Sequence, residues 1–231
     1  MTSRKIQYWV IPPKANGEFV AAMENVLETY AQPYDPRFPV LTMDEQPVQL
    51  LKETRQPIPA TKDHPQRVDY EYERAGTASV FMFAEPLSGW REVHARPHRT
   101  KVDWALEMAP LLRTRYAKAE KIIVVCDNLN THTMGAFYEA FAPANARDLV
   151  RRIEFRYTPK HGSWLNIAEN ELSSLHRQCL KDRRFFSLAE LRREVKAWAQ
   201  RCNKKQRGVD WQFKIDDART KLKSLYPKIE F

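Results

Sequence analysis

The chain has 231 residues, and its 38 Lys and Arg against 29 Asp and Glu give a formal net charge of +9. This excess of positive charge indicates a polyanionic partner, and nucleic acid is the first candidate. Hydrophobic residues make up 43% of the chain, which excludes a disordered basic tail and predicts a folded body.

The first half of the chain predicts a helix followed by strands. Apolar residues recur at helical spacing over 17–30, with Asn16 as the cap. The run "VLTMDEQP" predicts a short strand that ends at Asp44, and the proline-rich "LLKETRQPIPATKDHPQ" predicts a loop. The runs "VDYEYER", "TASVFMFAEP" and "WREVHA", separated by "AG" and "LSG" turns, predict an antiparallel meander.

The second half alternates helices with strands. Thr100 caps a predicted helix in "RTKVDWALEMAPLLRTRYAK", and the β-branched "KIIVVC" is typical of a strand buried on both faces. A short helix in "TMGAFYEAFAP", a strand in "RRIEFRYTP" and a helix in "NIAENELSSLHRQCL" follow. The last long helix, "SLAELRREVKAWAQRCN", has Ser187 and Glu190 spaced as a capping box. Three antiparallel strands followed by αβαβα predict an α/β fold, with helices on the faces of a mixed sheet.

Three acids stand at the ends of these predicted elements. Asp44 ends the first strand of the core, Asp127 ends the buried "KIIVVC" strand, and Glu169 opens the helix after the next strand. The tips of neighbouring strands lie close together, so we expect the three carboxylates to converge. Divalent magnesium neutralises such a cluster, and two ions about 4 Å apart clamp a phosphodiester during in-line displacement.

Each acid also has an interpretation without catalysis. Asp44 suits a turn, Asp127 with Asn128 suits a loop that satisfies backbone amides, and Glu169 with Asn166 suits a capping box. His132 lies near the proposed metals, but a lone loop histidine more often makes a local hydrogen bond, so we leave it out of the metal set.

Three blocks of sequence resemble the acidic blocks of a transposase family. "MDEQP", "VVCDNLNTH" and "TPKHGSWLNIAENEL" are similar to those of the DDE transposases of the bacterial insertion-sequence 630 family, relatives of the mariner-like elements. The similarity runs from about Trp9 to the closing "DARTKLKSLYP". It implies a ribonuclease H-like fold and an enzyme that cuts and joins DNA with Mg²⁺, for which Mn²⁺ substitutes.

The resemblance also implies roles for individual residues. Asp44, Asp127 and Glu169 fall in the matching blocks as the catalytic, metal-binding triad, and Asn128 is the supporting companion of the second aspartate. Glu171 competes with Glu169 for the third role, although only Glu169 has the "LNxxE" context. The spacing between the last two acids is longer than is usual in the family, and "AFAPANARDLVRR" is the expected place of the extra residues.

Basic residues surround the third acid. Between 177 and 207 there are eleven Lys or Arg against three acids, which indicates either a DNA-backbone track or an ordinary solvated helix face. The loop before Glu169 offers polar and aromatic side chains to phosphate or to a splayed base, although Trp164 equally suits the core. The predicted DNA-binding residues are Lys160, His161, Trp164, Asn166, Arg177, Lys181, Arg183 and Arg184.

We expect three parts along the chain: an N-terminal helix and linker over 1–36, a ribonuclease H-like catalytic domain over 37–205, and a basic tail over 206–231 that packs on or extends it. Family members carry helix-turn-helix domains before the catalytic domain, whereas this chain begins almost at the catalytic part. We therefore expect either a separately encoded helix-turn-helix half or a truncated remnant.

The expected function is that of a DDE transposase catalytic domain, active as a homodimer on element ends and target DNA. The alternatives are a catalytically silent DNA-binding remnant and a ribonuclease H-like nuclease that cuts without joining. Three scattered cysteines without a CxxC pair and the lack of any ~20-residue apolar run predict a cytoplasmic, nucleoid-associated protein without a membrane segment.

Overall fold

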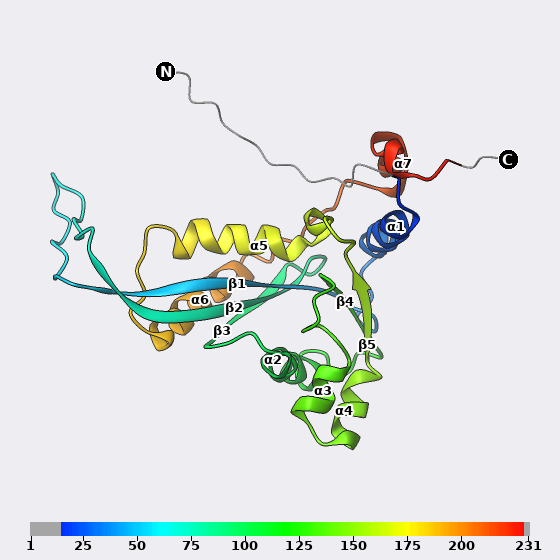
Figure 1. Ribbon diagram of the computed structural model, residues 1–231, viewed down its shortest axis with the longest axis horizontal. Coiled ribbons are helices and arrows are strands. Elements are labelled where there is room, and N and C mark those ends of the chain that lie inside the picture. The colour runs from blue at the N-terminus through cyan, green and yellow to red at the C-terminus, as the bar shows by residue number, and fades with distance from the viewer. Residues whose placement is uncertain (1–14, 229–231) are drawn as a thin grey trace.

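The computed structural model describes residues 15–228, and part of the predicted N-terminal segment therefore lies outside the described residues. Five strands form one sheet, with helices on both faces (Figure 1). In chain order the elements are α1 (Gly17–Ala31), β1 (Val40–Glu53), β2 (Tyr72–Glu85), β3 (Trp90–Arg96), α2 (Lys101–Arg113), β4 (Ile122–Cys126), α3 (Gly135–Ala140), α4 (Pro143–Val150), β5 (Ile153–Tyr157), the 3₁₀ helix η1 (Ser163–Leu165), α5 (Ile167–Leu175), the π-helical turn η2 (His176–Leu180), α6 (Leu188–Asn203), α7 (Ile215–Lys221) and the 3₁₀ helix η3 (Lys223–Leu225).

The sheet is mixed, as the sequence predicts. Its strand order is β3-β2-β1-β4-β5. Strands β1, β2 and β3 pair antiparallel, whereas β4 pairs parallel with both β1 and β5. This confirms three antiparallel strands followed by alternating helices and strands. The extra length in the "AFAPANARDLVRR" segment forms α4, between α3 and β5.

The predicted ends of the first strands are wrong. β1 does not stop at Asp44 but continues to Glu53, because it stays paired with β2 after its pairing with β4 has ended. The expected turn at "AG" is instead part of β2, which joins the first two runs of the predicted meander. Gly76 has φ of +99°, opposite a register shift between Gln49 and Leu51, so the glycine serves a bulge rather than a turn.

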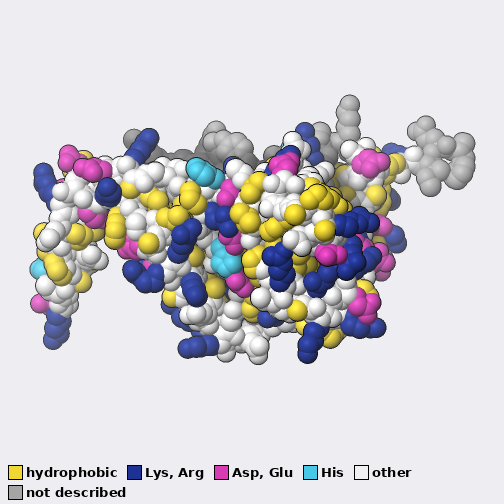
Figure 2. Space-filling model, turned by 90° about the horizontal axis from the view of Figure 1, so that it is seen from below, with side chains coloured by type: hydrophobic (Ala, Val, Ile, Leu, Met, Phe, Trp, Pro, Cys, Tyr) yellow, Lys and Arg dark blue, Asp and Glu magenta, His cyan; other side chains and the backbone are white. Residues whose placement is uncertain are grey.

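Beyond the sheet, β1 and β2 extend into a projecting arm, which we define as residues 54–71 (Figures 1 and 2). The arm carries three Lys or Arg and three Asp or Glu, so it is close to neutral in a strongly basic chain. Its exposed apolar side chains include Ile58, Val68 and Tyr70.

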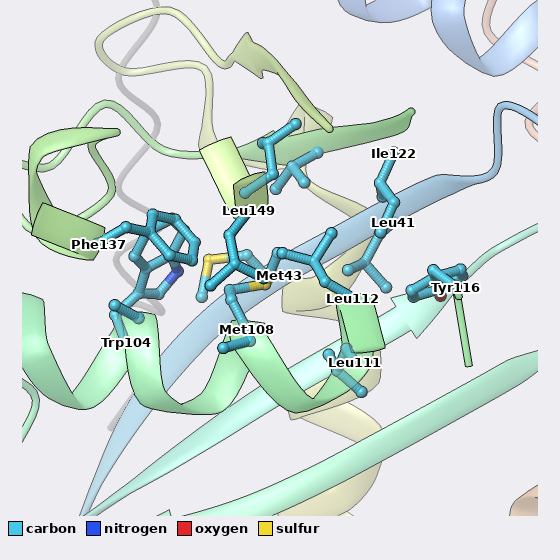
Figure 3. Close-up of a cluster of buried hydrophobic side chains, with 14 of the residues drawn as sticks. Leu41, Met43, Trp104, Met108, Leu111, Leu112, Tyr116, Ile122, Phe137 and Leu149 are labelled. Atoms are coloured by element: carbon cyan, nitrogen blue, oxygen red, sulfur yellow. The ribbon is translucent and has the colours of Figure 1, made fainter. Parts of the chain in front are cut away.

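Alternate residues of the central strands pack on opposite layers. Leu41 and Met43 of β1 and Val124 of β4 belong to a core beneath α2, α3 and α4, where Trp104 and Phe137 meet edge to face (Figure 3). The alternation follows from the strand period of two. It leaves Asp44 and Asp127 on the opposite face, where α5 lies.

That opposite face has two apolar clusters. Met82 and Val93 pack against α5 and α6, while Val40 and Val125 pack against α1 and the C-terminal segment. The predicted caps of three helices are confirmed: Asn16 caps α1, Thr100 caps α2 in a capping box, and Ser187 caps α6. Among residues 15–228, no helix is long and apolar enough to cross a bilayer.

Candidate active site

Asp44 and Asp127 stand at matching positions on two neighbouring parallel strands. The last paired residues of β1 and β4 are Thr42 and Val125, and each aspartate lies two residues further on. Both strands run in the same direction, so the two carboxylates leave the sheet side by side on the same face. The predicted meeting of strand tips therefore holds, although β1 itself continues.

Glu169 joins them from the first turn of α5. Asn166 caps this helix by accepting the backbone N–H of Ala168 at 3.1 Å. The Asn166 amide also donates to the carbonyl of Met43 at 2.9 Å and lies 3.4 Å from Oδ2 of Asp44. One side chain thus both starts α5 and anchors it beside Asp44, which sets the position of Glu169.

The electrostatics of Asp44 reflect this gathering of acids. Burial raises the pKa of Asp44 to about 7. The backbone N–H of Glu45 donates to Oδ1 at 2.7 Å and lowers this pKa, but burial has the larger effect. The negative charges of Asp127 and Glu169 raise this pKa further. Because the charges of Asp127 and Glu169 act on Asp44, the group favours either a shared proton or a bound cation.

Asp127 has a buried neighbour that the sequence analysis set aside. Nδ1 of His132 lies 2.7 Å from Oδ1 of Asp127, and Nε2 lies 3.2 Å from Oε1 of Glu45. Burial opposes protonation of this imidazole, but the hydrogen bonds of Asp127, Cys126 and Glu45 outweigh it and raise the pKa of His132 to about 12. The local contact expected for this histidine is present, but it involves a candidate catalytic carboxylate.

Glu45 is a further acid near the site, and it is not among the residues predicted from the sequence. Strand alternation places it on the opposite face from Asp44, where its side chain is only 3% exposed beside His132. The sequence does contain a sign of this buried acid, because Glu45 continues the alternation of Leu41 and Met43, which are buried on the α2 side of β1.

The two competing glutamates of α5 have separate environments. Glu171 is buried and binds Arg91 through two hydrogen bonds, of 2.7 Å to Nε and 2.6 Å to an Nη atom. Glu169 is partly exposed, and its charge acts on Asp44. The geometry therefore groups Glu169, not Glu171, with the two aspartates.

The chemistry of the three carboxylates fits a hard divalent cation. Their mutual repulsion leaves negative charge to be neutralised. As the side chains stand, no three Asp, Glu, His or Cys residues within 15–228 have a metal-binding arrangement, and Asp127 is turned toward His132. A hollow of about 690 Å³ lies elsewhere, along β3 and α6, and contains none of the three acids.

With this geometry in place, comparison with known proteins assigns the family. Residues 39–192 match the family model described as DDE superfamily endonuclease. The chain belongs to this family. No curated protein matches it in sequence.

Solved structures share the fold of this DDE endonuclease domain. The crystal structure of a pre-cleavage Mos1 transpososome matches with a TM-score of 0.56 and 16% identity, over 99% of this chain and 68% of that chain. The Mos1 mariner paired end complex with Mn matches with a TM-score of 0.52 and 16% identity, over 89% of this chain. The catalytic domain of Mos1 mariner transposase matches with a TM-score of 0.50 and 14% identity, over 86% of this chain and 93% of that chain. The chain spans 64% of the length of the Mn complex.

The loop before α5 presents two of the predicted DNA-binding residues at the surface of the DDE endonuclease domain. Lys160 and His161 are exposed and line a hollow of about 340 Å³ with Asn128 and Tyr157. Trp164 lies at the surface rather than in the core, because it is 36% exposed, and its ring packs edge to face against Phe213.

Two of the predicted DNA contacts are already used inside the protein. Asn166 is 2% exposed, caps α5 and donates to the carbonyl of Met43. Its position therefore suits holding Asp44 in place rather than contacting DNA. Arg184 binds Glu53 at 2.6 Å and the backbone carbonyl of Asp69 at 2.7 Å, at the base of the arm. Arg177 and Lys181 are exposed, whereas exposed Arg183 pairs with Glu194 at 2.7 Å. Buried position and competing partners therefore argue against Asn166 and Arg184 as DNA contacts.

Proposed function

We propose that this DDE endonuclease domain is the catalytic domain of an insertion-sequence transposase of the 630 family. The observation that carries the proposal is the side-by-side placement of Asp44 and Asp127, with Glu169 near enough to raise the pKa of Asp44. Membership of the DDE endonuclease family supports the same assignment.

In this proposal, Asp44, Asp127 and Glu169 are the catalytic residues and hold two Mg²⁺ ions, for which Mn²⁺ substitutes. The bound ions would activate the attacking oxygen and stabilise the leaving oxygen. Asn166 keeps Asp44 in place through Met43, and Asn128 supports Asp127 from the adjoining loop position. The buried Glu171–Arg91 pair holds α5 against β3, so that Glu169 stays at the site.

The proposed reaction has two steps of the same kind. A water oxygen attacks a phosphodiester at the element end, forming one P–O bond and breaking another, and a 3′-hydroxyl is released. That hydroxyl then attacks a phosphodiester of target DNA, again exchanging one P–O bond for another. The second step separates a transposase from a nuclease.

DNA is the proposed partner, and the distribution of charge supports it. Figure 2 looks onto the side of α2, α3 and α4, where Lys and Arg side chains are scattered among hydrophobic and acidic groups. The chain has a net charge of +9, and on the other side of the sheet Lys160, His161, Arg177 and Lys181 are exposed near α5 and η2.

We further propose that the domain acts in a bacterial cytoplasm as a homodimer on DNA. The exposed apolar residues of the near-neutral arm support a protein contact rather than a phosphate contact there.

The experiment that tests the proposal is strand joining. A short duplex with a recessed element-like 3′-hydroxyl end is incubated with supercoiled plasmid, full chain and Mn²⁺, and covalent joining is measured on denaturing gels. Joined product supports the transposase. Cutting of DNA without any joining would favour the nuclease, and binding that survives replacement of all three acids without cutting would favour the silent remnant.

A further inference from the structure

His132 is a buried histidine that the proposed reaction does not use. Its side chain is 1% exposed, yet it lies between two acids: Asp127 at 2.7 Å on one side and Glu45 at 3.2 Å on the other. Glu45 itself is 3% exposed. The three side chains form a buried chain of charged groups that crosses from the α2 side of the sheet to the carboxylates.

The surroundings hold the imidazole in one place. The ring of Trp104, on α2, has its centroid 5.7 Å from that of His132. The backbone N–H of His132 donates to the carbonyl of Leu129 at 3.0 Å, and the hydroxyl of Tyr157 donates to the carbonyl of His132 at 2.8 Å. Ring packing and backbone hydrogen bonds therefore fix His132 relative to both β4 and β5.

The two halves of the Asp127 carboxylate differ in their access to solvent. Oδ1 is buried and has Nδ1 of His132 at 2.7 Å, although the side chain as a whole is 35% exposed. The exposed part must therefore lie away from His132, at the open edge shared with Asp44. The imidazole therefore contacts Oδ1, which water does not reach, and leaves the rest of the Asp127 carboxylate available to a metal ion.

We propose that His132 is a positioning residue that fixes the carboxylate of Asp127 through Nδ1, and that Glu45 in turn fixes His132 through Nε2. The inference rests on the proposed function, because it treats Asp127 as a metal ligand. Groups that orient a ligating side chain typically change metal affinity about 10–100-fold when they are removed.

Two substitutions of His132 separate its two nitrogens. In His132→Asn, the amide nitrogen can occupy the place of Nδ1 and still donate to Asp127, whereas the contact with Glu45 is lost. In His132→Gln, the amide nitrogen reaches the place of Nε2 and the contact with Asp127 is lost. Both replacements remove the ring that packs on Trp104, so they share any purely structural cost.

The test measures Mn²⁺ binding to the full chain by the electron paramagnetic resonance signal of free Mn²⁺. We expect His132→Gln to weaken Mn²⁺ affinity at least about tenfold. We expect His132→Asn to stay within about threefold of wild type, because it keeps one hydrogen bond to Asp127. His64→Gln, an exposed histidine on the arm, is the matched control and should bind as wild type does.

The proposal is overturned if both His132 variants bind Mn²⁺ like wild type, or if both lose affinity equally, since equal loss indicates only missing ring packing. If the His132 variants do not fold, Glu45→Leu keeps the imidazole and its packing on Trp104 but removes the acceptor beside Nε2, and unchanged Mn²⁺ affinity in that variant overturns the proposal too. Asp127→Asn separates the two claims. Unchanged Mn²⁺ binding in Asp127→Asn defeats the proposed function itself, whereas lost binding there with intact binding in the His132 variants defeats only the positioning role.

Discussion

Asn166 donates its side-chain amide to the carbonyl of Met43 at 2.9 Å, and so joins the start of α5 to the strand position next to Asp44. We expect Asn166→Ala to lower the free energy of unfolding by about 2 kcal/mol, because it removes a helix cap and leaves a buried carbonyl without its partner. It should also reduce DNA nicking, since Asp44 loses its neighbour. Chemical denaturation and a nicking assay measure the two effects.

Ser187→Ala is the control for this substitution, because Ser187 caps α6 and does not contact any of the three acids. It should lower stability by about 1 kcal/mol, the typical value of a helix cap, and leave nicking unchanged at a temperature where it is folded. Equal nicking by Asn166→Ala and Ser187→Ala would show that Asn166 only stabilises the helix.

Glu169 and Glu171 should respond oppositely to replacement by glutamine. Glu171→Gln leaves the buried charge of Arg91 without its partner and should lower the free energy of unfolding by roughly 3 kcal/mol. Glu169→Gln relieves repulsion with Asp44, so stability should hold or rise while nicking is lost. Thermal melting and nicking, measured on both variants, test this pair. Retained nicking in Glu169→Gln would remove it from the proposed triad.

The His94 side chain should make stability depend on pH. Burial works against its charged form, but hydrogen bonds to Glu107 and Glu92 prevail and raise the pKa of His94 to about 9. A folded-state pKa above the unfolded value of about 6.5 stabilises the fold fully below pH 6.5, and this stabilisation is lost as the pH rises through about 9.

His94→Gln should therefore be less stable than wild type by about 2 kcal/mol at pH 6, a figure lowered for partial solvent screening, and the difference should shrink by pH 10. Urea denaturation at several pH values measures it. His98→Gln, which replaces an exposed histidine, should show no such trend. A difference between His94→Gln and wild type that does not change with pH would contradict the assignment.

The segment after Lys205 should be required for folding. The backbone N–H of Val209 donates to the carbonyl of Pro86 at 2.8 Å, and Arg219 binds Glu24 of α1 at 2.9 Å. Trp211 and Phe213 cover the α1 cluster. A chain that ends at Lys205 should expose this cluster and lose near-UV circular dichroism, whereas one that ends at Lys228 should keep it. A stable chain ending at Lys205 would support 37–205 as a self-sufficient domain.

The order of elements was predictable because each one carries its own local signal. The run "KIIVVC" has four consecutive β-branched residues and forms the fully buried β4. The caps at Asn16, Thr100 and Ser187 are set by residues within one turn. The extension of β1 beyond Asp44 was not predictable from "DEQP", because a long-range partner, β2, sustains the strand there.

The site was partly predictable for the same reason. Asp127 and Glu169 follow directly from the end of β4 and the start of α5. The choice between Glu169 and Glu171 depends on Arg91, and the role of His132 depends on Glu45 from another strand. Because these contacts join residues far apart in the chain, no local sequence pattern predicts them.

Asp44, Asp127 and Glu169 are proposed to form one metal-dependent cutting site, and plasmid nicking by Asp127→Asn is the decisive measurement. Supercoiled plasmid is incubated with wild type, Asp127→Asn and the exposed control Asp148→Asn, in Mg²⁺, in Mn²⁺ and with a chelator. The account predicts that wild type and Asp148→Asn nick the plasmid only with metal, while Asp127→Asn binds DNA but does not nick it. Nicking by Asp127→Asn at the rate of wild type would contradict it.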